Sequence, residues 1–354
     1  MDKPFFSVLM PVYNSQSTVK RAVDSVLAQR FPDFELILVD DCSTDGSRKI
    51  LAEYAEQNSK IKVIRTQRNL GVANARNEGI KLVQGQYLTF VDADDYIEPE
   101  LFAKVRDVIE QTGAQLVKYS VVEEYYDKNS RYLGNKNVQL SNKLYTTAAE
   151  VRKAVLPMEQ LPLFGYLWNG FYSLETVPKY LWDFDTQWRV NEDFRMNMKL
   201  IEHINRMACM SYIGYHYKKQ ENASLSTRDN QQYYELTKIK IQLLLDSYKK
   251  WGFLTSRVEN TIYWLYIRIV YSTVCRVLLQ STRKAARLEL EKVYGDTLFQ
   301  RFLSENGNAC YASKKQNVMY RWLYGQHTEK ILFLCTAINL VKKHFQVIFA
   351  KIKG

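Results

Sequence analysis

The sequence predicts an α/β protein with a mostly parallel sheet flanked by helices, followed by an α-helical C-terminal region. Two observations support this fold class. Over the first 120 residues, short apolar runs of strand type alternate with segments whose apolar residues recur at helical spacing. Strands separated by helices form βαβ units, in which successive strands run parallel. After about residue 230 the strand signals stop and only long helical patterns remain.

Each element follows from its local pattern. The expected strands are apolar runs at 6–11, 35–40, 62–65, 87–91 and 115–122. The expected helices between them are 18–27, 45–55, 72–83 and 99–109. Residues 123–146 are polar and rich in tyrosine, which indicates loop or edge structure. Helical stretches are expected at 233–250, 257–282, 284–292 and 329–350 in the tail. We therefore expect two parts, residues 1–230 and 231–354, with the first divided at about residue 120.

The charge is distributed unevenly between these parts. The chain of 354 residues has a net charge of +11, yet residues 1–230 hold 29 Lys and Arg against 30 Asp and Glu. Residues 231–354 hold 20 against 8. A basic tail on a neutral body predicts a polyanionic partner: nucleic acid, an anionic membrane surface or an acidic substrate.

Other features bear on the compartment. The five cysteines are far apart and form no CxxC pair, which argues against a zinc ribbon and favours a reducing cytoplasm. The N-terminus is a poor signal peptide because Pro11 interrupts a short apolar run. The apolar windows 261–279 and 331–350 contain central Lys or Arg, each costing about 2.5–3.5 kcal/mol in a spanning helix. We expect neither window to cross a membrane.

Polar residues cluster where the expected strands end. In an open parallel sheet, ligands bind beyond the carboxyl ends of the strands. Three of these ends are followed by Pro11, Val12, Tyr13 and Asn14, by Asp40 and Asp41, and by Asp92, Ala93, Asp94 and Asp95. Three neighbouring carboxylates repel each other, and a divalent cation such as magnesium or manganese relieves the repulsion. The alternative is a solvated acidic turn or a helix cap. A carboxylate at a strand end can also accept the N3–H of uracil.

Several other chemistries lack their motifs. The sequence has no GxGxxG after a strand and no GxxxxGK[ST], so neither a dinucleotide fold nor a P-loop is indicated. It has no nucleophile elbow and no HExxH, and its four histidines show no ligand spacing.

Four segments then occur in order and at a characteristic spacing. They are SVLMPVYN (7–14), ELILVDDCSTDGS (35–47), NLGVANARNEGI (69–80) and GQYLTFVDADD (85–95). Together they resemble the family 2 inverting glycosyltransferases of the GT-A fold, of the type that builds bacterial surface polysaccharides. The resemblance is strong over residues 5–115, moderate to about 225 and absent beyond.

The resemblance implies a nucleotide-sugar donor, usually a UDP-sugar, and Mn²⁺ or Mg²⁺. The residues implied at the nucleotide are Pro11, Val12, Tyr13, Asn14, Asp40, Asp41, Asn69, Arg76, Asp92 and Ala93. Asp40 would read the uracil, Arg76 would lie on the base and diphosphate side, and Asp92 would hold the ribose. Asp94 would be the main metal ligand, with Asp95 the weaker candidate. Cys42 stands where the family has a glycine, which bears on loop shape.

A second group of segments completes the implied site. VNEDFRMNMKLIE (190–202) resembles the family's ED motif, so Asp193 would be the base that deprotonates the acceptor and Glu192 would orient the site. The alternative is that Asp193 simply caps the following helix. Trp168 and Asn169 resemble the family's acceptor-facing W-N-K stretch, with Gly170 in place of the lysine. Lys218 and Lys219, in a segment resembling a flexible loop of the family, would close over the diphosphate.

The basic tail mixes aromatic residues with Lys and Arg but contains no nucleic-acid motif. Interfacial helices on an anionic membrane suit this composition better. The alternative is packing on the catalytic part or in a homodimer. Processive relatives carry QxxRW, whereas here Gln316 precedes Arg321-Trp322 at a different spacing, which predicts a non-processive enzyme.

The sequence thus predicts a glycosyltransferase of hexosyl or N-acetylhexosaminyl type that acts on a glycan or lipid-linked acceptor. We expect it in the cytoplasm, with a peripheral position on the inner face of the plasma membrane as one arrangement. Two other functions remain open: a non-catalytic nucleotide-sugar-binding scaffold, and a sugar-phosphate nucleotidyltransferase. The latter would need a glycine- and arginine-rich phosphate loop after the first strand, where Pro11 to Asn14 stand.

Overall fold

The computed structural model describes residues 3–127, 129–187, 191–220, 233–307, 309–311 and 313–344. The chain divides into two compact units, Met1–Lys219 and Gln220–Gly354, which we describe separately. The boundary expected near residue 230 falls within 221–232, outside the described residues.

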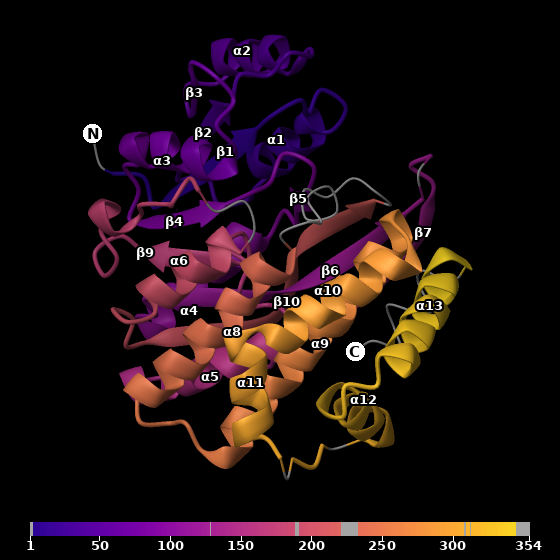
Figure 1. Ribbon diagram of the computed structural model, residues 1–354. Helices are drawn as coiled ribbons and strands as arrows, with labels where there is room; N and C mark the ends of the chain where they lie inside the picture. Colours follow the sequence, from indigo (N-terminus) through magenta and orange to yellow (C-terminus); the bar gives the residue numbers. More distant parts are fainter. Residues whose placement is uncertain are drawn as a thin grey trace. The chain divides into compact units, whose positions relative to one another are not determined.

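The first unit is an α/β fold (Figure 1). Its strands are β1 Phe6–Val12, β2 Phe34–Asp40, β3 Ile61–Arg65, β4 Tyr87–Phe90, β5 Tyr96–Ile97, β6 Leu116–Tyr126, β7 Tyr132–Val138, β8 Lys143–Tyr145, β9 Gly170–Ser173 and β10 Met207–Gln220. Its helices are α1 Val19–Leu27, α2 Ser47–Gln57, α3 Val72–Leu82, α4 Leu101–Thr112, α5 Ala148–Gln160 and α6 Glu192–Leu200, with a short 3₁₀ turn at Lys179–Leu181.

One mixed sheet organises this unit. Its strand order is β3-β2-β1-β4-β9-β6-β10-β5, with β7 added beside β6 and β8 beside β10. The first four strands run parallel, and β9 joins them antiparallel to both β4 and β6. Strands β1 and β2 are almost wholly buried, as expected of strands covered on both faces by helices. The α/β prediction for this part is confirmed.

The register of the parallel strands brings their carboxyl ends together. Val12 at the end of β1 pairs with Asp40 at the end of β2, and Asp40 pairs with Arg65 at the end of β3. Phe90, the last residue of β4, pairs with Leu9, so the chain from Asp92 onward leaves the sheet beside the same edge. This edge therefore gathers the polar residues that follow three strands.

The segment expected to be loop or edge structure is more ordered than its composition indicates. Residues 116–126 form one long strand, β6, which pairs antiparallel with β7 in a hairpin. Tyr125 and Tyr126, from the segment expected to be loop or edge structure, lie at the end of β6, where their side chains are partly buried. Tyrosine is common in strands because its ring packs on a pleated surface, and here that tendency outweighs the polar neighbours.

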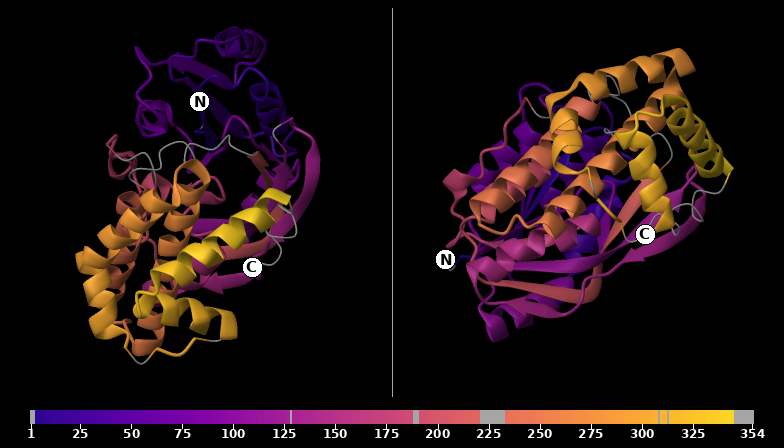
Figure 2. Two further views of the ribbon diagram at one scale, coloured as in Figure 1. Left: turned by 45° about the vertical axis from the view of Figure 1, so that its right-hand side comes forward. Right: turned by 60° about the horizontal axis from the view of Figure 1, so that its bottom comes forward.

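The second unit is helical throughout its described residues. Its helices are α8 Tyr233–Lys250, α9 Ser256–Gln280, α10 Arg283–Gly295, α11 Thr297–Glu305, α12 Lys314–Tyr324 and α13 Thr328–His344. They pack side by side around α9 (Figure 2). The expected helical tail is confirmed; α11 and α12 are additional short helices, and the expected stretch 329–350 is described only as far as residue 344.

Helix α9 is the one described helix that is long and apolar enough to cross a membrane, by length and composition alone. It also supplies the core of this unit, because Tyr263, Tyr266, Val270 and Tyr271 on it are buried. The Tyr266 hydroxyl meets that of Tyr234 at 2.8 Å, so a neighbouring helix satisfies its polar end. These contacts are those of a packed core helix.

Candidate active site

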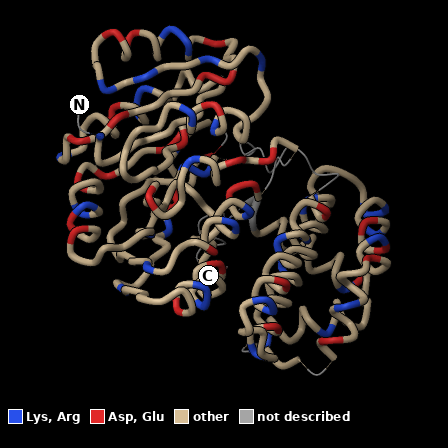
Figure 3. The backbone as a smooth tube through the Cα atoms, turned by 90° about the vertical axis from the view of Figure 1, so that its left-hand side faces the viewer, with Lys and Arg blue, Asp and Glu red and all other residues tan. Residues whose placement is uncertain are grey.

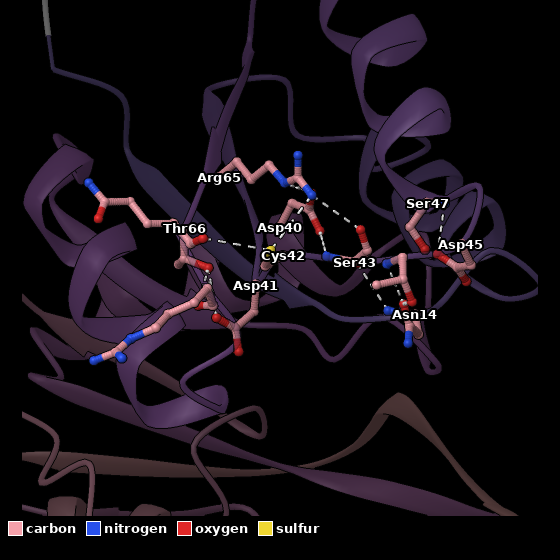
Figure 4. A network of polar contacts seen from close by, with 12 residues as sticks. Asn14, Asp40, Asp41, Cys42, Ser43, Asp45, Ser47, Arg65 and Thr66 are labelled. Atoms are coloured by element: carbon pink, nitrogen blue, oxygen red, sulfur yellow. Dashed lines mark hydrogen bonds and ion pairs between the residues drawn. The ribbon is translucent and has the colours of Figure 1, made fainter.

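Asp40 anchors a polar network at the ends of β2 and β3 (Figure 4). Its side chain is only 1% exposed, and Oδ1 accepts a hydrogen bond from the Ser43 backbone at 2.9 Å. Oδ2 lies 3.2 Å from Nε of Arg65, whose guanidinium also reaches the Ser43 carbonyl. Oδ2 itself has no well-formed hydrogen bond among the described residues. A buried carboxylate oxygen of this kind can still accept a hydrogen bond from a ligand.

Asp41 has a different task. Its Oδ1 accepts from the Thr66 hydroxyl at 2.8 Å and from the Leu70 backbone at 3.3 Å, and Oδ2 accepts from the Gly71 backbone at 2.8 Å. Gly71 has a φ of 90°, a conformation that favours glycine. Asp41 thus holds the 66–71 loop, and the exposed Asn69, expected at the nucleotide, lies on that loop.

The β1 end contributes backbone and one amide side chain. Val12 is buried, whereas Tyr13 is 47% exposed beside it. Asn14 has a φ of 47°, and its Oδ1 accepts from the Thr44 backbone at 2.8 Å. Cys42 also has a positive φ, 60°, in the left-handed region that glycine adopts most easily.

The acidic residues after β4 separate into exposed and buried groups. Asp94 is exposed, Asp92 is partly exposed, and Ala93 between them is buried. Burial by the surrounding protein raises the pKa of both carboxyls, although nearby cations oppose it: Arg76 at Asp92, and Lys218 with Arg21 at Asp94. A raised pKa in an accessible carboxylate marks a position where a cation would be stabilising.

Asp95 is fully buried and already satisfied. Its Oδ2 accepts from the Tyr215 hydroxyl at 2.9 Å and its Oδ1 from the Lys218 backbone at 2.7 Å. The Tyr215 hydroxyl also accepts from the Asp92 backbone at 3.1 Å. Asp95 therefore ties the acidic turn to β10 and leaves Asp94, with Asp92, as the carboxylates open to a ligand.

Arg76 lies among three carboxylates rather than in the open. Its side chain is 3% exposed, and one terminal nitrogen bonds Asp193 and, at 3.2 Å, Glu192. The other terminal nitrogen is 3.8 Å from Asp92. The resemblance implies a position for Arg76 beside the base and diphosphate, and in this structure its terminal nitrogens face the protein's own acids.

Helix α6 presents the acid pair at its first turn. Asn191 occupies the N-cap position with a φ of 62°, so Asp193 is not the cap of this helix. Negative side chains are stabilised near a helix N-terminus, which suits both Glu192 and Asp193. Burial and the neighbouring Asp193 raise the pKa of Glu192, while Arg76 opposes them. The two side chains are 14% and 16% exposed, so a ligand can still reach them.

Trp168 and Asn169, which the resemblance places toward the acceptor, have buried side chains in this structure. Trp168 stacks between Tyr166 and Tyr215, at ring distances of 4.5 and 4.2 Å. Asn169 donates to the Leu163 carbonyl and accepts from the Lys118 ammonium at 2.9 Å. Both residues therefore belong to the core behind the site. Trp168 packs there by aromatic stacking, and the buried amide of Asn169 is satisfied by hydrogen bonds.

Lys218 and Lys219 also differ from one another. The ammonium of Lys219 is paired with Glu123 on β6, so its charge is already neutralised within the protein. Lys218 lies over the Tyr126 ring, 5.1 Å from its centroid, and its charge acts on Asp94. Lys218 is thus the better placed of the two for an anionic ligand.

Sequence reasoning missed the residues that brace the site. Lys118 is fully buried, donates to the Tyr166 carbonyl at 2.6 Å, and burial lowers its pKa to about 7. Asn197 on α6 donates to the Phe164 carbonyl at 2.9 Å, so the helix that carries Asp193 is tied to the same loop. Lysine is rarely buried, so an isolated Lys inside the strand pattern was the available signal.

The carboxylates after β4 are the residues that bear on binding of a divalent cation. Among the described residues, no group of three or more His, Cys, Asp or Glu is arranged to hold a metal by itself. The carboxylates of Asp94 and Asp92 fit a magnesium or manganese ion whose remaining ligands come from phosphate and water. The residues are therefore compatible with a metal bound together with a diphosphate.

Comparison with known proteins agrees with this geometry. The sequence model described as glycosyl transferase family 2 matches residues 7–167. The chain is 29% identical to the uncharacterized glycosyltransferase EpsJ of Bacillus subtilis over 220 residues, which is 62% of each protein. It is 43% identical over 97 residues to a poly(ribitol-phosphate) beta-glucosyltransferase of Bacillus spizizenii, 27% of this chain and 15% of the relative. The chain thus spans less than two thirds of the length of these relatives.

Solved structures show the same fold. The structure of S. aureus TarS residues 1–349 in complex with UDP-GlcNAc aligns with a TM-score of 0.58 at 19% identity, covering 96% of this chain and 91% of that one. A second structure of TarS residues 1–349, with UDP, gives a TM-score of 0.57 at 17% identity. The predicted GT-A fold with a helical C-terminal region is confirmed by this likeness.

Proposed function

Because the glycosyl transferase family 2 model matches residues 7–167, we propose that the chain is an inverting, metal-dependent, non-processive glycosyltransferase. It moves a sugar from a nucleotide-sugar, most simply a UDP-sugar, to a hydroxyl of a glycan or lipid-linked acceptor in surface polysaccharide synthesis. One observation carries the proposal: Asp92 after β4 and the acid pair that opens α6, distant in sequence, meet at one arginine, Arg76.

The donor half of the site suits a uridine nucleotide. The inward Oδ2 of Asp40 is a buried acceptor, and uracil offers an N3–H donor between two carbonyls. Tyr13 and Asn14 flank this position from the end of β1. The TarS complexes with UDP and UDP-GlcNAc support a uridine donor by analogy of fold.

The acid pair suits deprotonation of an acceptor. Asp193 accepts the proton of the acceptor hydroxyl as that oxygen bonds to the anomeric carbon. The bond from the anomeric carbon to the diphosphate oxygen breaks in the same in-line displacement, and UDP leaves with the electron pair. Attack from the face opposite the leaving group inverts the anomeric centre.

The diphosphate needs positive charge as it departs. Asp94, with Asp92, would hold a divalent cation, which when bound stabilises negative charge on the leaving phosphates. Lys218 beside Asp94 would supply a further cation to the same oxygens. Asp95 supports this arrangement from beneath by fixing the turn to β10.

The helical unit suits a peripheral position on the cytoplasmic face of an anionic membrane. Figure 3 shows Lys and Arg distributed along its helices, and Phe333, Leu340 and Val341 on α13 are 70%, 57% and 41% exposed. Exposed apolar residues beside basic ones are typical of interfacial helices. A homodimer through the same face is the competing arrangement, and sedimentation with phosphatidylglycerol vesicles against the oligomeric state in solution distinguishes them.

The test is UDP release from a panel of UDP-sugars in the presence of Mn²⁺, with candidate glycan acceptors. The wild-type protein should release UDP with one donor, Asp94→Ala should abolish release, and NMR should show an inverted anomeric centre in the product. UDP binding without release from any donor would instead indicate a scaffold. Release of pyrophosphate from UTP and a sugar phosphate would indicate a nucleotidyltransferase.

A further inference from the structure

Arg76 lies between the acidic turn after β4 and the first turn of α6. The proposed reaction requires a fixed distance between these two segments. It comes from α3, which packs on β1 and β2 and is therefore fixed to the sheet. Its terminal nitrogens reach the donor side of the site at Asp92 and the acceptor side at Glu192 and Asp193. Arg76 thus contacts acids on both sides of the site.

The guanidinium is held in place by more than its ion pairs. Its carbon lies 5.7 Å from the centroid of Phe90 and 5.5 Å from that of Phe184, so two aromatic rings border the group. The next residue on α3, Asn77, exchanges two hydrogen bonds of 2.8 Å with the backbone of Phe184. Helix α3, the end of β4 and the 182–185 segment thus form one frame around Arg76.

This frame leaves Arg76 badly placed to bind a donor directly. Its side chain is 3% exposed, and both terminal nitrogens face carboxylates of the protein. An arginine that neutralises a diphosphate must instead expose its planar fork to the phosphate oxygens. The positive charge of Arg76 is already balanced by the carboxylates of Asp92, Glu192 and Asp193.

We propose that Arg76 is a positioning residue, which orients Asp193 toward the acceptor hydroxyl and registers it with the donor side through Asp92. The assignment rests on the proposed function. Without the guanidinium, Asp92, Glu192 and Asp193 repel one another, and Asp193 loses the bond that fixes its side chain. A displacement of about 1 Å of a catalytic group costs on the order of 100-fold in rate.

The test uses the full chain and two readouts. UDP affinity is measured by titration calorimetry with Mn²⁺, and the turnover number is measured by UDP release from the donor that the wild-type protein uses. Arg76→Met should lower turnover about 100-fold and leave the UDP dissociation constant essentially unchanged. Arg76→Lys keeps the charge and should recover part of the turnover while remaining folded if the methionine variant is not.

The matched control is Arg152→Met, which removes another arginine of this unit, one paired with Glu202 and outside the site. It should leave both readouts at the wild-type level. A weakened UDP affinity in Arg76→Lys and Arg76→Met with turnover retained would overturn the assignment and make Arg76 a donor ligand. Unchanged turnover in both variants would also overturn it.

Failure of the proposed function gives a different result. If the wild-type protein releases UDP from no donor, the proposed function fails and the assignment falls with it. If the wild-type protein turns over and only the Arg76 variants behave contrary to expectation, the assignment alone fails.

Discussion

Two regions of the site handle negative charge in opposite ways. In the loops after β2 and β3, Asp41 is buried against three donors of its own chain, and its charge is fully satisfied. At the ends of β4 and α6, Asp92, Glu192 and Asp193 share one guanidinium, and burial raises the pKa of Asp92 and Glu192. The first region is built to hold a shape, whereas the second keeps an excess of negative charge that a cation or a proton must balance.

Removing the divalent cation should have the largest effect and fall on the second region alone. With a chelator, UDP release should drop on the order of 1000-fold, since a metal at a leaving diphosphate contributes several kcal/mol. The melting temperature should stay unchanged, because Asp41 and Asp95 are satisfied without a metal. Full activity in chelator would break the comparison by showing that the leaving diphosphate needs no metal.

Substitution of Asp41 tests the first region by stability. Asp41→Ala removes a buried acceptor of three hydrogen bonds and should lower the free energy of unfolding by about 3 kcal/mol, as measured by denaturant titration. Asp45→Ala is the matched control: Asp45 accepts from the Gln16 and Ser47 backbones in a more exposed setting. It should cost less. Equal costs would show that burial does not distinguish the two acids.

His216 and Glu124, which lie beside the second region, should make the stability of the protein depend on pH. Hydrogen bonds to Glu124 and Glu98 raise the pKa of His216, although burial alone would lower it. Burial alone would raise the pKa of Glu124, and hydrogen bonds from His216, Tyr96 and Tyr126 lower it to about 2. The pKa of His216 is higher in the folded state, so its contribution is full below about pH 6.5 and is lost as the pH rises through the folded value. The Glu124 contribution is present above about pH 4.5 and is lost as the pH falls toward 2.

The melting temperature of the wild-type protein should therefore decline as the pH rises above 6.5. His216→Gln should remove most of this decline, because glutamine keeps hydrogen bonding without a titrating charge. A variant with the same slope as the wild type would show that His216 does not link β10 to Glu98 and Glu124 through its charge.

The smallest effect is expected outside the site. Phe333→Ser on the exposed face of α13 should leave UDP release and stability nearly unchanged, because the side chain is 70% exposed. It should weaken sedimentation with anionic vesicles several-fold. Thr336→Ser, on the same exposed side of the helix, is the control. A large loss of stability in Phe333→Ser would instead place this residue in a packed interface.

Much of the fold was predictable because its signals are local. The strands ending at Asp40 and Phe90 and the helix from Val72 follow directly from apolar periodicity, and strand ends in a parallel sheet must share an edge. The resemblance to the family supplied the ED pair. The positions of Trp168 and Arg76 could not be predicted, because they depend on contacts with Tyr215 and Asp193 across more than forty residues of sequence.

Two further outcomes show where local patterns mislead. Asp94 and Asp95 are adjacent and chemically identical, yet the turn exposes one and buries the other against Tyr215. Lys118 lies in a strand whose neighbours are all buried, and its ammonium donates to the carbonyls of a distant loop and to the side-chain oxygen of Asn169. Sequence spacing gives residue types at an edge, and tertiary packing decides which of them reach the ligand.

The most direct test of the account compares Asp193→Asn with Asp40→Asn in one pair of assays, UDP affinity and UDP release. Asp193→Asn should lower the turnover number on the order of 1000-fold with UDP affinity unchanged, as loss of a general base does. Asp40→Asn should weaken UDP binding about tenfold, with a much smaller effect on turnover at saturating donor. Retained turnover in Asp193→Asn with a verified donor and acceptor would contradict the assignment of chemistry to the acid pair.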